Sequence, residues 1–450
     1  MELKGSRIHF MGIGGIGVSA LAEMAKAAGA LVSGCDRSEN EITLALRRKG
    51  LNVALGHDPS HLDGVDYLVH TSAVSSQHPE RLRAGEKQEK RGAFLARLMD
   101  NHQAIGVAGT HGKTTTSWLL SQLLIECGRD PTVFIGGLAA SLPEGNYRLG
   151  SGPFVSELDE SDESFLLPKL EVAVATNLES DHLSHYKTYP ALYQAFQRYA
   201  RGVEKEGLLV AGLDSPELAK IFAAHSGKKL SFGFNPACDI RATEVENQGF
   251  NSRFRLEYLH QDKGLFNLFL PGHHNVLNAL AALGTCLALG LDPEELRSAL
   301  PKAIGVGRRL EFLGEIAGAR FYSDYAHHPT EIRACLAALK QAFSGPILAV
   351  FQPHLYSRTR DYAREFAQAL AEGAEVVQLV DIYPAREEPI PGVDSALISS
   401  FARELNPRVE DPLPLAQAVE TARDRAGDFQ AVVMLGAGDI DNAARELFPG

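Results

Sequence analysis

The stretch Gly109-Thr110-His111-Gly112-Lys113-Thr114-Thr115-Thr116 follows a short apolar run, residues 104–108, and opens a helical pattern. This order predicts a strand, a glycine loop and a helix, in which backbone N–H groups and the helix N-terminus hold phosphate oxygens. Lys113 is placed to reach the terminal phosphates of a nucleotide, and the Thr114 hydroxyl to ligate Mg²⁺. Position 107 is Val where the strict phosphate-loop pattern has Gly, so the Gly-Lys-Thr core carries the match. The alternative is an ordinary glycine turn before a helix, but strand, loop, Lys, Thr and helix agree on nucleotide binding.

Length and composition indicate an ordinary globular chain of several domains. At 450 residues it is too long for one core, and a prior of about 150 residues per domain predicts three. The net charge of −12 excludes a basic field that gathers nucleic acid. The five scattered cysteines contain no Cys-x-x-Cys pair, so the sequence suggests neither a zinc cluster nor a disulfide framework. Without a signal peptide or a membrane-spanning run, we expect a cytoplasmic protein with no nucleic-acid or membrane partner, either a monomer or a weak homodimer.

Strand and helix patterns alternate along the chain and predict an α/β fold in three domains, each built on a mostly parallel sheet. We expect a Rossmann-like N-terminal domain at 1–95, a phosphate-loop ATPase domain at 96–305 and a Rossmann-like C-terminal domain at 306–450. An alternating apolar and polar stretch, 239–270, predicts antiparallel strands. The strands expected elsewhere are 7–11, 30–35, 65–70, 104–108, 154–157, 172–176, 207–211, 320–322, 347–351, 375–380 and 431–435.

A second glycine loop lies near the N-terminus. Gly12-Ile13-Gly14-Gly15-Ile16-Gly17 matches G-x-G-x-x-G between a predicted strand and a predicted helix, and Asp36 ends the next strand. This geometry specifies a diphosphate on a helix N-terminus and a sugar hydroxyl near an acid, so a dinucleotide and a UDP-linked sugar both satisfy it. Tight helix–strand packing without a ligand is the remaining alternative. The candidate ligand-binding residues of this loop are Gly12, Gly14, Gly15, Gly17 and Asp36.

Two acidic runs, 157–163 and 177–182, each follow an apolar strand. They should emerge at the carboxyl edge of a parallel sheet, where open α/β folds bind ligands. Mg²⁺ prefers one or two carboxylates together with water and phosphate oxygens. Glu157 stands closest to its strand end and is the best candidate ligand, while His182 is a less usual magnesium neighbour. A solvated acidic face is the alternative.

Together these motifs resemble the Mur ligase family, and the resemblance covers nearly the whole chain. The loops 12–17 and 109–116 are similar to the family's UDP-sugar and ATP loops, and the two acidic runs to its magnesium motifs. The segment 272–279 resembles its adenine-side motif, and 307–311 the arginine motif that meets the ATP phosphates. The most diagnostic segments are Asp324–Glu331, Phe351–Arg360 and Asp381–Glu387, which resemble the alanine-adding subgroup.

The resemblance implies an ATP-dependent, amide-bond-forming ligase of peptidoglycan precursor synthesis. Such an enzyme joins the amine of L-alanine to the lactyl carboxylate of UDP-N-acetylmuramate through an acyl-phosphate intermediate, with ATP and Mg²⁺ as cofactors. An acyl phosphate hydrolyses readily, so the site must exclude water. The alternatives are a ligase that attaches a tripeptide in murein recycling, a nicotinamide-dependent oxidoreductase that uses the first loop, and a non-catalytic nucleotide-binding regulator.

The resemblance also implies roles for individual side chains. Lys113 and Arg309 would stabilise charge on the γ-phosphate. His182 would lie near a second Mg²⁺, and His327 would orient or deprotonate the incoming amine. The implied residues are Lys113, His182, Arg309 and His327 for catalysis; Gly109, Thr110, His111, Gly112, Lys113, Thr114, Thr115, Asn275, Asn278, Arg309 and Asp324 for ATP; Gly12, Gly14, Gly15, Gly17, Asp36, Ser72, His327 and Arg358 for the substrates; and Thr114, Glu157 and His182 for Mg²⁺.

Two further roles have alternatives, and the chain departs from its relatives in two places. Asn275 and Asn278 lie three residues apart on one predicted helix face and would address the base, with a helix N-cap as the alternative. Arg358 would hold the alanine carboxylate by a bidentate pair, although such an arginine is more commonly a surface residue. Leu355 stands where some members of the subgroup carry Arg, so one contact to a substrate carboxylate is expected to be absent or supplied elsewhere. No Lys occurs between positions 187 and 205, so we predict that the carbamylated lysine of several sister ligases is missing.

Overall fold

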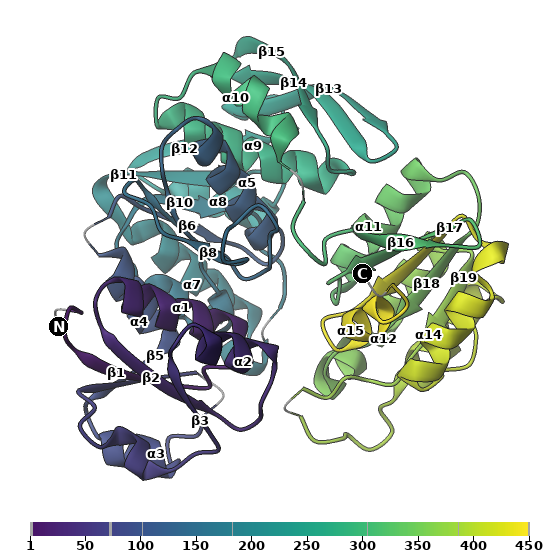
Figure 1. Ribbon diagram of the computed structural model, residues 1–450. Coiled ribbons are helices and arrows are strands. Elements are labelled where there is room, and N and C mark those ends of the chain that lie inside the picture. Colours follow the sequence, from purple (N-terminus) through teal and green to yellow (C-terminus); the bar gives the residue numbers. More distant parts are fainter. Residues whose placement is uncertain are drawn as a thin grey trace. The chain divides into compact units, whose positions relative to one another are not determined.

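The structure, a computed structural model, describes residues 3–71, 74–100, 102–181, 183–303, 305–385 and 387–448. Three sheets in which parallel pairing dominates, with helices packed on them, form a three-domain α/β fold (Figure 1). Packing groups the chain into two units. One holds Met1–Ala242, Leu256–Lys263 and Leu277–Leu300, and the other holds Thr243–Arg255, Gly264–Val276 and Pro301–Gly450.

The first sheet lies in the first unit and is parallel throughout, in the order β3-β2-β1-β4-β5. The strand order reverses between β1 and β4, and open parallel sheets bind ligands beyond the carboxyl ends of the strands at such a point. β1 ends directly before the first glycine loop. The bounds are β1 Arg7–Met11, α1 Ile16–Ala27, β2 Leu31–Asp36, α2 Glu41–Arg48, β3 Asn52–Leu55, the 3₁₀ turn η1 Pro59–Leu62, β4 Tyr67–His70, α3 Pro79–Ala84, β5 Gln88–Lys90 and α4 Arg91–Met99.

The second sheet has ten strands in the order β15-β14-β13-β12-β11-β10-β6-β9-β7-β8. β6, between β10 and β9, is buried at all five residues, as its continuous apolar run requires. The bounds are β6 Ala104–Ala108, α5 Lys113–Glu126, β7 Thr132–Phe134, β8 Tyr147–Arg148, β9 Phe154–Glu157, η2 Glu160–Asp162, η3 Ser164–Leu166, β10 Leu170–Ala175, α6 Leu183–Tyr186, α7 Tyr189–Arg201, β11 Val203–Gly212, α8 Pro216–Ala224, β12 Lys228–Gly233, β13 Ile240–Gln248, β14 Asn251–Tyr258, β15 Gln261–Leu268, α9 His273–Ala288, α10 Pro293–Ala299 and η4 Leu300–Lys302.

The third sheet lies in the second unit, in the order β16-β17-β20-β18-β19. Only β16 runs antiparallel to its neighbour. The bounds are β16 Glu311–Ile316, β17 Ala319–Asp324, α11 Pro329–Ala342, β18 Ile347–Phe351, α12 Tyr356–Gly373, β19 Val376–Leu379, α13 Ser395–Leu405, α14 Leu415–Asp424, η5 Ala426–Asp428, β20 Ala431–Leu435 and α15 Ile440–Arg445.

The predicted fold class is confirmed, and the differences lie at sheet edges and at two strands inside the second sheet, β7 and β12, which the sequence pattern did not predict. The strands predicted at 7–11, 104–108, 154–157, 347–351 and 431–435 coincide with β1, β6, β9, β18 and β20. The sequence pattern did not predict β3, β5 or β16, which are short or half-exposed edge strands and carry little apolar periodicity. The stretch 239–270 forms β13, β14 and β15, joined by two-residue turns.

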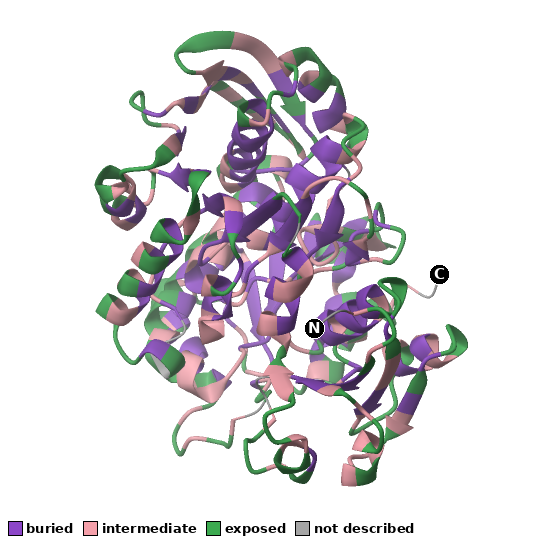
Figure 2. Cartoon of the chain, turned by 90° about the vertical axis from the view of Figure 1, so that its left-hand side faces the viewer, coloured by how far each residue is buried: buried purple, intermediate pink, exposed green. Residues whose placement is uncertain are grey.

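Burial follows the layers of the fold. Buried residues gather in the strands and along α5, while many of the other helices also carry exposed residues (Figure 2). All five cysteines are free, and four of them are buried. Within the described ranges, none of the helices combines the length and the hydrophobicity needed to span a bilayer.

Candidate active site

The phosphate loop joins β6 to α5, and two of its glycines adopt backbone conformations that other residues avoid. Gly109 has φ +143° and Gly112 has φ +80°. A Cβ at Gly109 would lie 1.9 Å from Thr176 Oγ1, and one at Gly112 would lie 2.3 Å from Asn278 Oδ1. Glycine alone fits both positions without displacing a neighbour. Among the described residues no side chain caps α5, and its first turn holds no acidic residue, so its positive end is available to an anion.

The segment that follows β10 holds this loop in place. Thr110 N donates to Asn177 O at 3.1 Å, and His111 N donates to Asn177 Oδ1 at 2.8 Å. Thr176 Oγ1 and Asn177 Nδ2 both donate to His111 O, at 2.6 and 3.0 Å. Glu179 N donates to Thr110 Oγ1 at 2.9 Å. The second acidic run is therefore fastened to the loop, which pre-organises the loop for a nucleotide.

Lys113 begins α5, and its side chain turns back over the loop. Its Nζ donates to Gly109 O at 2.5 Å, to Thr110 O at 3.1 Å and to Glu160 Oε1 at 2.9 Å. Burial lowers the pKa of Lys113, but the nearby carboxylates, led by Glu160, outweigh burial and hold the pKa above its usual value. The ammonium is therefore a fixed positive charge at neutral pH, placed at the centre of the phosphate loop.

Two of the three candidate magnesium ligands, Glu157 and Thr114, lie around the same loop. Glu157 ends β9, and its Oε2 accepts a hydrogen bond from Gly136 N at 2.7 Å. Thr114 is buried in the first turn of α5. His182 lies outside the residues that the structure describes. Carboxylate and hydroxyl oxygens are the donors that Mg²⁺ takes, so Glu157 and Thr114 fit a hard divalent cation.

Asn275 and Asn278 both lie in α9, yet their side chains have different partners. Asn275 Nδ2 donates to Pro271 O at 2.8 Å. Asn278 Oδ1 accepts from Thr116 Oγ1 at 3.2 Å and lies beside Gly112. Because α9 begins at His273, neither asparagine is the residue that caps it. Asn278 therefore supports the start of α5, while Asn275 contacts the segment before α9, and their assignment to the base stays a prediction.

In the first glycine loop, the first backbone N–H groups donate hydrogen bonds to other parts of the protein. Gly12 N and Ile13 N donate to Cys35 O at 2.9 and 3.1 Å, and Gly14 N donates to Asp36 Oδ2 at 2.8 Å. An anionic group at this loop would therefore meet the first turn of α1. No side chain in the described part of the chain caps that helix.

Arg91 lies beside this first turn, although the sequence did not single it out. A Cβ at Gly17 would come within 2.5 Å of Arg91 Nη1, and Arg91 Nη2 lies 3.8 Å from Asp159 Oδ2. Within the first unit, Arg91 thus stands between the first glycine loop and the first acidic run. Ser72, the other substrate residue predicted in this region, lies outside the described residues.

In the second unit, the two arginines of the 307–311 motif have separate partners. Arg308 Nη2 donates to Gly436 O at 2.7 Å and to Gly438 O at 3.2 Å. The Arg309 guanidinium lies over the Tyr325 ring, 5.4 Å from its centroid, and has no hydrogen-bond partner among the described residues. Arg308 therefore uses its guanidinium for hydrogen bonds within the protein, whereas the N–H groups of Arg309 are available to a ligand.

Asp324 ends β17 behind this motif. Its Oδ2 accepts from Leu310 N and its Oδ1 from Ala326 N, both at 2.8 Å. Burial raises the pKa of Asp324 to about 6, although Arg309 and the two N–H groups oppose the shift. Asp324 thus joins the backbone after β17, at Ala326, to the backbone of the arginine motif, at Leu310, so it positions that motif.

His327 follows the same strand end. Its Nδ1 lies 3.0 Å from Tyr325 O and 3.3 Å from Glu331 Oε2. Arg358 lies in the first turn of α12 and is half-buried. Leu355 precedes that helix with φ +70°, and its N donates to Tyr383 O at 3.0 Å.

The sequence did not predict three features of the site. These are the pairing of Glu160 with Lys113, the position of Arg91 beside the first glycine loop, and the different partners of Arg308 and Arg309. Glu160 stands in an acidic run in which any carboxylate could have faced the lysine. Arg91 belongs to a charged stretch that is typical of solvated surface. One feature of the sequence could have indicated the separate roles of the arginines. The 307–311 motif holds two adjacent arginines, and adjacent side chains in a tight turn point in different directions, so only one of them can face a given ligand.

Models of three Mur ligase segments match the chain in order. The model described as Mur ligase family, catalytic domain, matches residues 7–103. The Mur ligase middle domain matches 107–286, and the Mur ligase, glutamate ligase domain, matches 308–438.

Curated relatives match the chain over nearly its full length. The UDP-N-acetylmuramate–L-alanine ligase of Renibacterium salmoninarum is 39% identical over 449 residues, which cover 98% of this chain and 95% of that protein. The ligase of the same name from Clavibacter michiganensis subsp. michiganensis is 40% identical, covering 96% of this chain and 91% of that protein.

Solved structures share the fold. The crystal structure of a UDP-N-acetylmuramate–alanine ligase from Thermotoga maritima has a TM-score of 0.83 at 29% identity, and covers 98% of this chain and 97% of that one. A murein peptide ligase from Psychrobacter arcticus has a TM-score of 0.72 at 24% identity, covering 98% of both chains, which is a likeness of fold. With three family models in order and relatives about 40% identical along its length, this chain belongs to the Mur ligase family.

Proposed function

We propose that this protein joins L-alanine to the lactyl carboxylate of UDP-N-acetylmuramate, with ATP converted to ADP and phosphate. The observation that carries the proposal is the full-length similarity, at 39–40% identity, to ligases named for this substrate and this amino acid. The phosphate loop and its half-buried lysine support the ATP-dependent part, since members of this family are ATP-dependent ligases.

The reaction requires activation of a poor electrophile. A carboxylate resists attack by an amine, so phosphoryl transfer from ATP first converts it into an acyl phosphate. The amine then attacks the acyl carbon and expels phosphate. Because the acyl phosphate hydrolyses readily, closure of the site against water is part of the mechanism.

Lys113 is the residue of the first unit best placed to stabilise this transfer. Its ammonium is held by Glu160 and two loop carbonyls, so a nucleotide whose phosphates enter the loop exchanges those partners for phosphate oxygens. Phosphoryl transfer depends mainly on positioning and charge stabilisation, and one such group contributes about 3 kcal/mol. Glu157 and Thr114 would hold Mg²⁺, which when bound neutralises phosphate charge.

In the second unit, we assign Arg309 to the ATP phosphates and His327 to the amine. The Tyr325 carbonyl can only accept a hydrogen bond, so the geometry favours the proton on His327 Nδ1 and leaves Nε2 as the basic nitrogen. Arg358, in the first turn of α12, is assigned to the alanine carboxylate.

We also propose the division of labour among the domains. Residues 1–95 would bind the UDP-sugar, 96–305 would bind ATP, and 306–450 would bind the amino acid. The uncapped first turn of α1 supports the first assignment and the phosphate loop the second. A nicotinamide-dependent oxidoreductase would leave the phosphate loop and Lys113 without a role, and the curated relatives favour alanine over a tripeptide.

The test is an amino-acid panel in an ADP-release assay with ATP and Mg²⁺. We expect ADP release that requires both UDP-N-acetylmuramate and L-alanine, with a UDP-muramyl-alanine as product. Glycine, L-serine and the tripeptide of murein recycling complete the panel. ADP release with the tripeptide but not with alanine would reject the proposal in favour of the recycling reaction. Release that needs neither substrate would reject ligation.

A further inference from the structure

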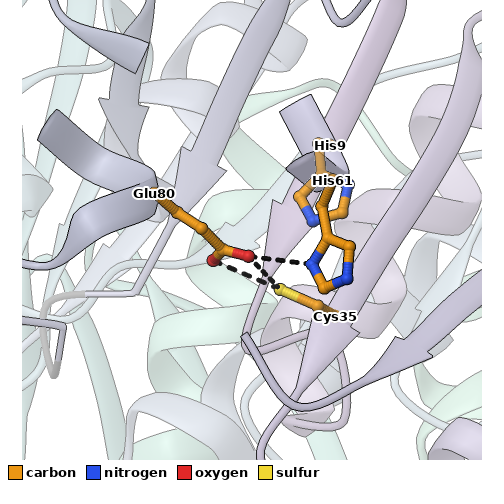
Figure 3. Close-up of side chains that lie close together, drawn as sticks. All are labelled: His9, Cys35, His61 and Glu80. Carbon is orange, nitrogen blue, oxygen red and sulfur yellow. Dashed lines mark hydrogen bonds and ion pairs between the residues drawn. The ribbon is translucent and has the colours of Figure 1, made fainter. Parts of the chain in front are cut away.

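Four side chains of the first domain, which the proposed reaction does not use, converge in its interior. They are His9 from β1, Cys35 from β2, His61 from η1 and Glu80 from α3 (Figure 3). One ligand atom from each lies within 4.8 Å of the other three. His9 is 2% exposed, and Cys35 and Glu80 are fully buried, so three of the four side chains are shielded from solvent. The His61 side chain, 21% exposed, is the one that reaches solvent.

The separations inside the cluster are close to those of a metal centre. Cys35 Sγ lies 3.5 and 3.6 Å from the two Glu80 carboxylate oxygens, and His61 Nδ1 lies 2.9 Å from Glu80 Oε1. In a tetrahedral zinc site with bonds of about 2.0–2.3 Å, neighbouring ligand atoms lie about 3.3–3.8 Å apart. All separations in the cluster are 4.8 Å or less, so the wider ones have to shrink by at most about 1–1.5 Å, which side-chain rotation can supply.

His9 provides an independent indication. Its Nε2 is buried and has no hydrogen-bond partner among the described residues, while its Nδ1 lies 2.9 Å from Ser33 Oγ. Metal-bound histidines commonly bond to the protein through one nitrogen and to the metal through the other.

The charges of the four groups also match a divalent cation. A Cys35 thiolate and a Glu80 carboxylate carry two negative charges, and the two imidazoles carry none. A dication would make the buried assembly neutral, which avoids the cost of an uncompensated charge in the interior. Sulfur and imidazole nitrogen are ligands of zinc rather than of magnesium.

A hydrogen-bonded network around Glu80 is the competing explanation. Glu80 Oε1 accepts from Asp58 N at 2.9 Å and from His61 Nδ1, and the Cys35 thiol donates to the same carboxylate. In this network, hydrogen bonds satisfy the Glu80 carboxylate and the Cys35 thiol without a metal. However, the network offers no hydrogen-bond partner to His9 Nε2 within the described residues.

We propose that His9, Cys35, His61 and Glu80 form a structural binding site for one zinc ion. His57 would support it from outside, because its Nδ1 lies 3.2 Å from Cys35 Sγ and 3.4 Å from Glu80 Oε2. The Cys35 carbonyl accepts the Gly12 and Ile13 N–H groups, so a metal on its side chain braces the first glycine loop.

Cobalt substitution tests this site in the full-length protein. The protein is treated with a chelator and titrated with Co²⁺ in excess Mg²⁺, which occupies the oxygen-rich site of the phosphate loop. We expect one equivalent of Co²⁺ to give the near-ultraviolet charge-transfer band of a cobalt–thiolate bond and the visible bands of a tetrahedral site, and Zn²⁺ to abolish both. Cys35→Ser should lose the charge-transfer band, while Cys238→Ser, at another buried and free cysteine, should keep it.

Glu80→Gln is a second variant, which keeps the test informative if Cys35→Ser fails to fold. It preserves the side-chain volume at position 80 and leaves the Cys35 thiol in place. This variant should retain the charge-transfer band but bind Co²⁺ at least about tenfold more weakly. Absence of the band in the unsubstituted protein would overturn the proposal in favour of the hydrogen-bonded network. A band that persists in Cys35→Ser and disappears in Cys238→Ser would overturn it as well.

Discussion

Lys113 Nζ and Glu160 Oε1 lie 2.9 Å apart, and the Glu160 side chain is 1% exposed. Removing one partner of a buried ion pair leaves the other charge uncompensated. We expect Glu160→Gln to lower the free energy of unfolding by about 3 kcal/mol, measured by urea denaturation. Glu163→Gln is the matched control, because Glu163 pairs with Arg198 at 3.2 Å on the surface and should change stability by about 0.5 kcal/mol or less. Equal losses in the two variants would contradict a buried pair at the loop.

Gly112→Ala tests the packing of the phosphate loop. The new Cβ would meet Asn278 Oδ1 at 2.3 Å in addition to the strain of φ +80°. Gly128→Ala is the control, since Gly128 has φ +70° and a Cβ added there would meet no atom within 4 Å. The control therefore carries the backbone strain alone, about 1–2 kcal/mol.

We expect Gly112→Ala to lose more stability than Gly128→Ala and to bind ATP more weakly. In a double-mutant cycle, Asn278→Ala should relieve part of the loss in Gly112→Ala. A purely additive cycle would show that Asn278 does not constrain the loop. Thermal unfolding and nucleotide titration supply the two readouts.

Arg308 and Arg309 should give opposite results when each is replaced by alanine. Arg308→Ala removes the donors to Gly436 O and Gly438 O and should destabilise the protein by about 2 kcal/mol. Arg309→Ala should change stability little and lower kcat by about 10²–10³-fold. Turnover and denaturation of both variants decide the point, and the reverse pattern would exchange the roles of the two residues.

Asp324 should make stability depend on pH in a defined window. Burial raises its pKa from an unfolded value of 3.8 to about 6, so between these pH values the folded state keeps a proton that the unfolded state has lost. The contribution of Asp324 to stability therefore falls as pH rises through this window, by about 3 kcal/mol in total.

The midpoint of thermal unfolding, followed from pH 4 to pH 7, checks the sign. Asp324→Asn does not titrate, so its stability relative to the unsubstituted protein should rise with pH across the window. A flat difference for Asp324→Asn would mean that the carboxyl is solvated in the folded protein.

Most of the central strands and both glycine loops could be predicted because they depend on local signals. The apolar run of β6 and the glycines at 109 and 112 specify a strand and a phosphate loop without reference to the rest of the chain. The edge strand β5 could not be predicted, since Gln88–Lys90 is short and polar and becomes a strand by pairing with β4.

Contacts between distant segments were beyond sequence reasoning. Scattered cysteines suggested no zinc cluster, yet the topology of the first sheet brings Cys35 to His9 on the neighbouring strand and to Glu80, 45 residues away. The choice of Glu160 as the partner of Lys113 has the same origin, because η2 buries Glu160 while the other carboxylates of the run stay half-buried.

Phosphoryl transfer from ATP to the substrate's own carboxylate is the step on which the proposed function depends. Its most direct test uses UDP-N-acetylmuramate labelled with ¹⁸O in the lactyl carboxylate, incubated with the enzyme, ATP, Mg²⁺ and L-alanine. We predict that ADP forms and that each inorganic phosphate carries one ¹⁸O, while the amide keeps the other. Unlabelled phosphate, or AMP as the nucleotide product, would contradict this step.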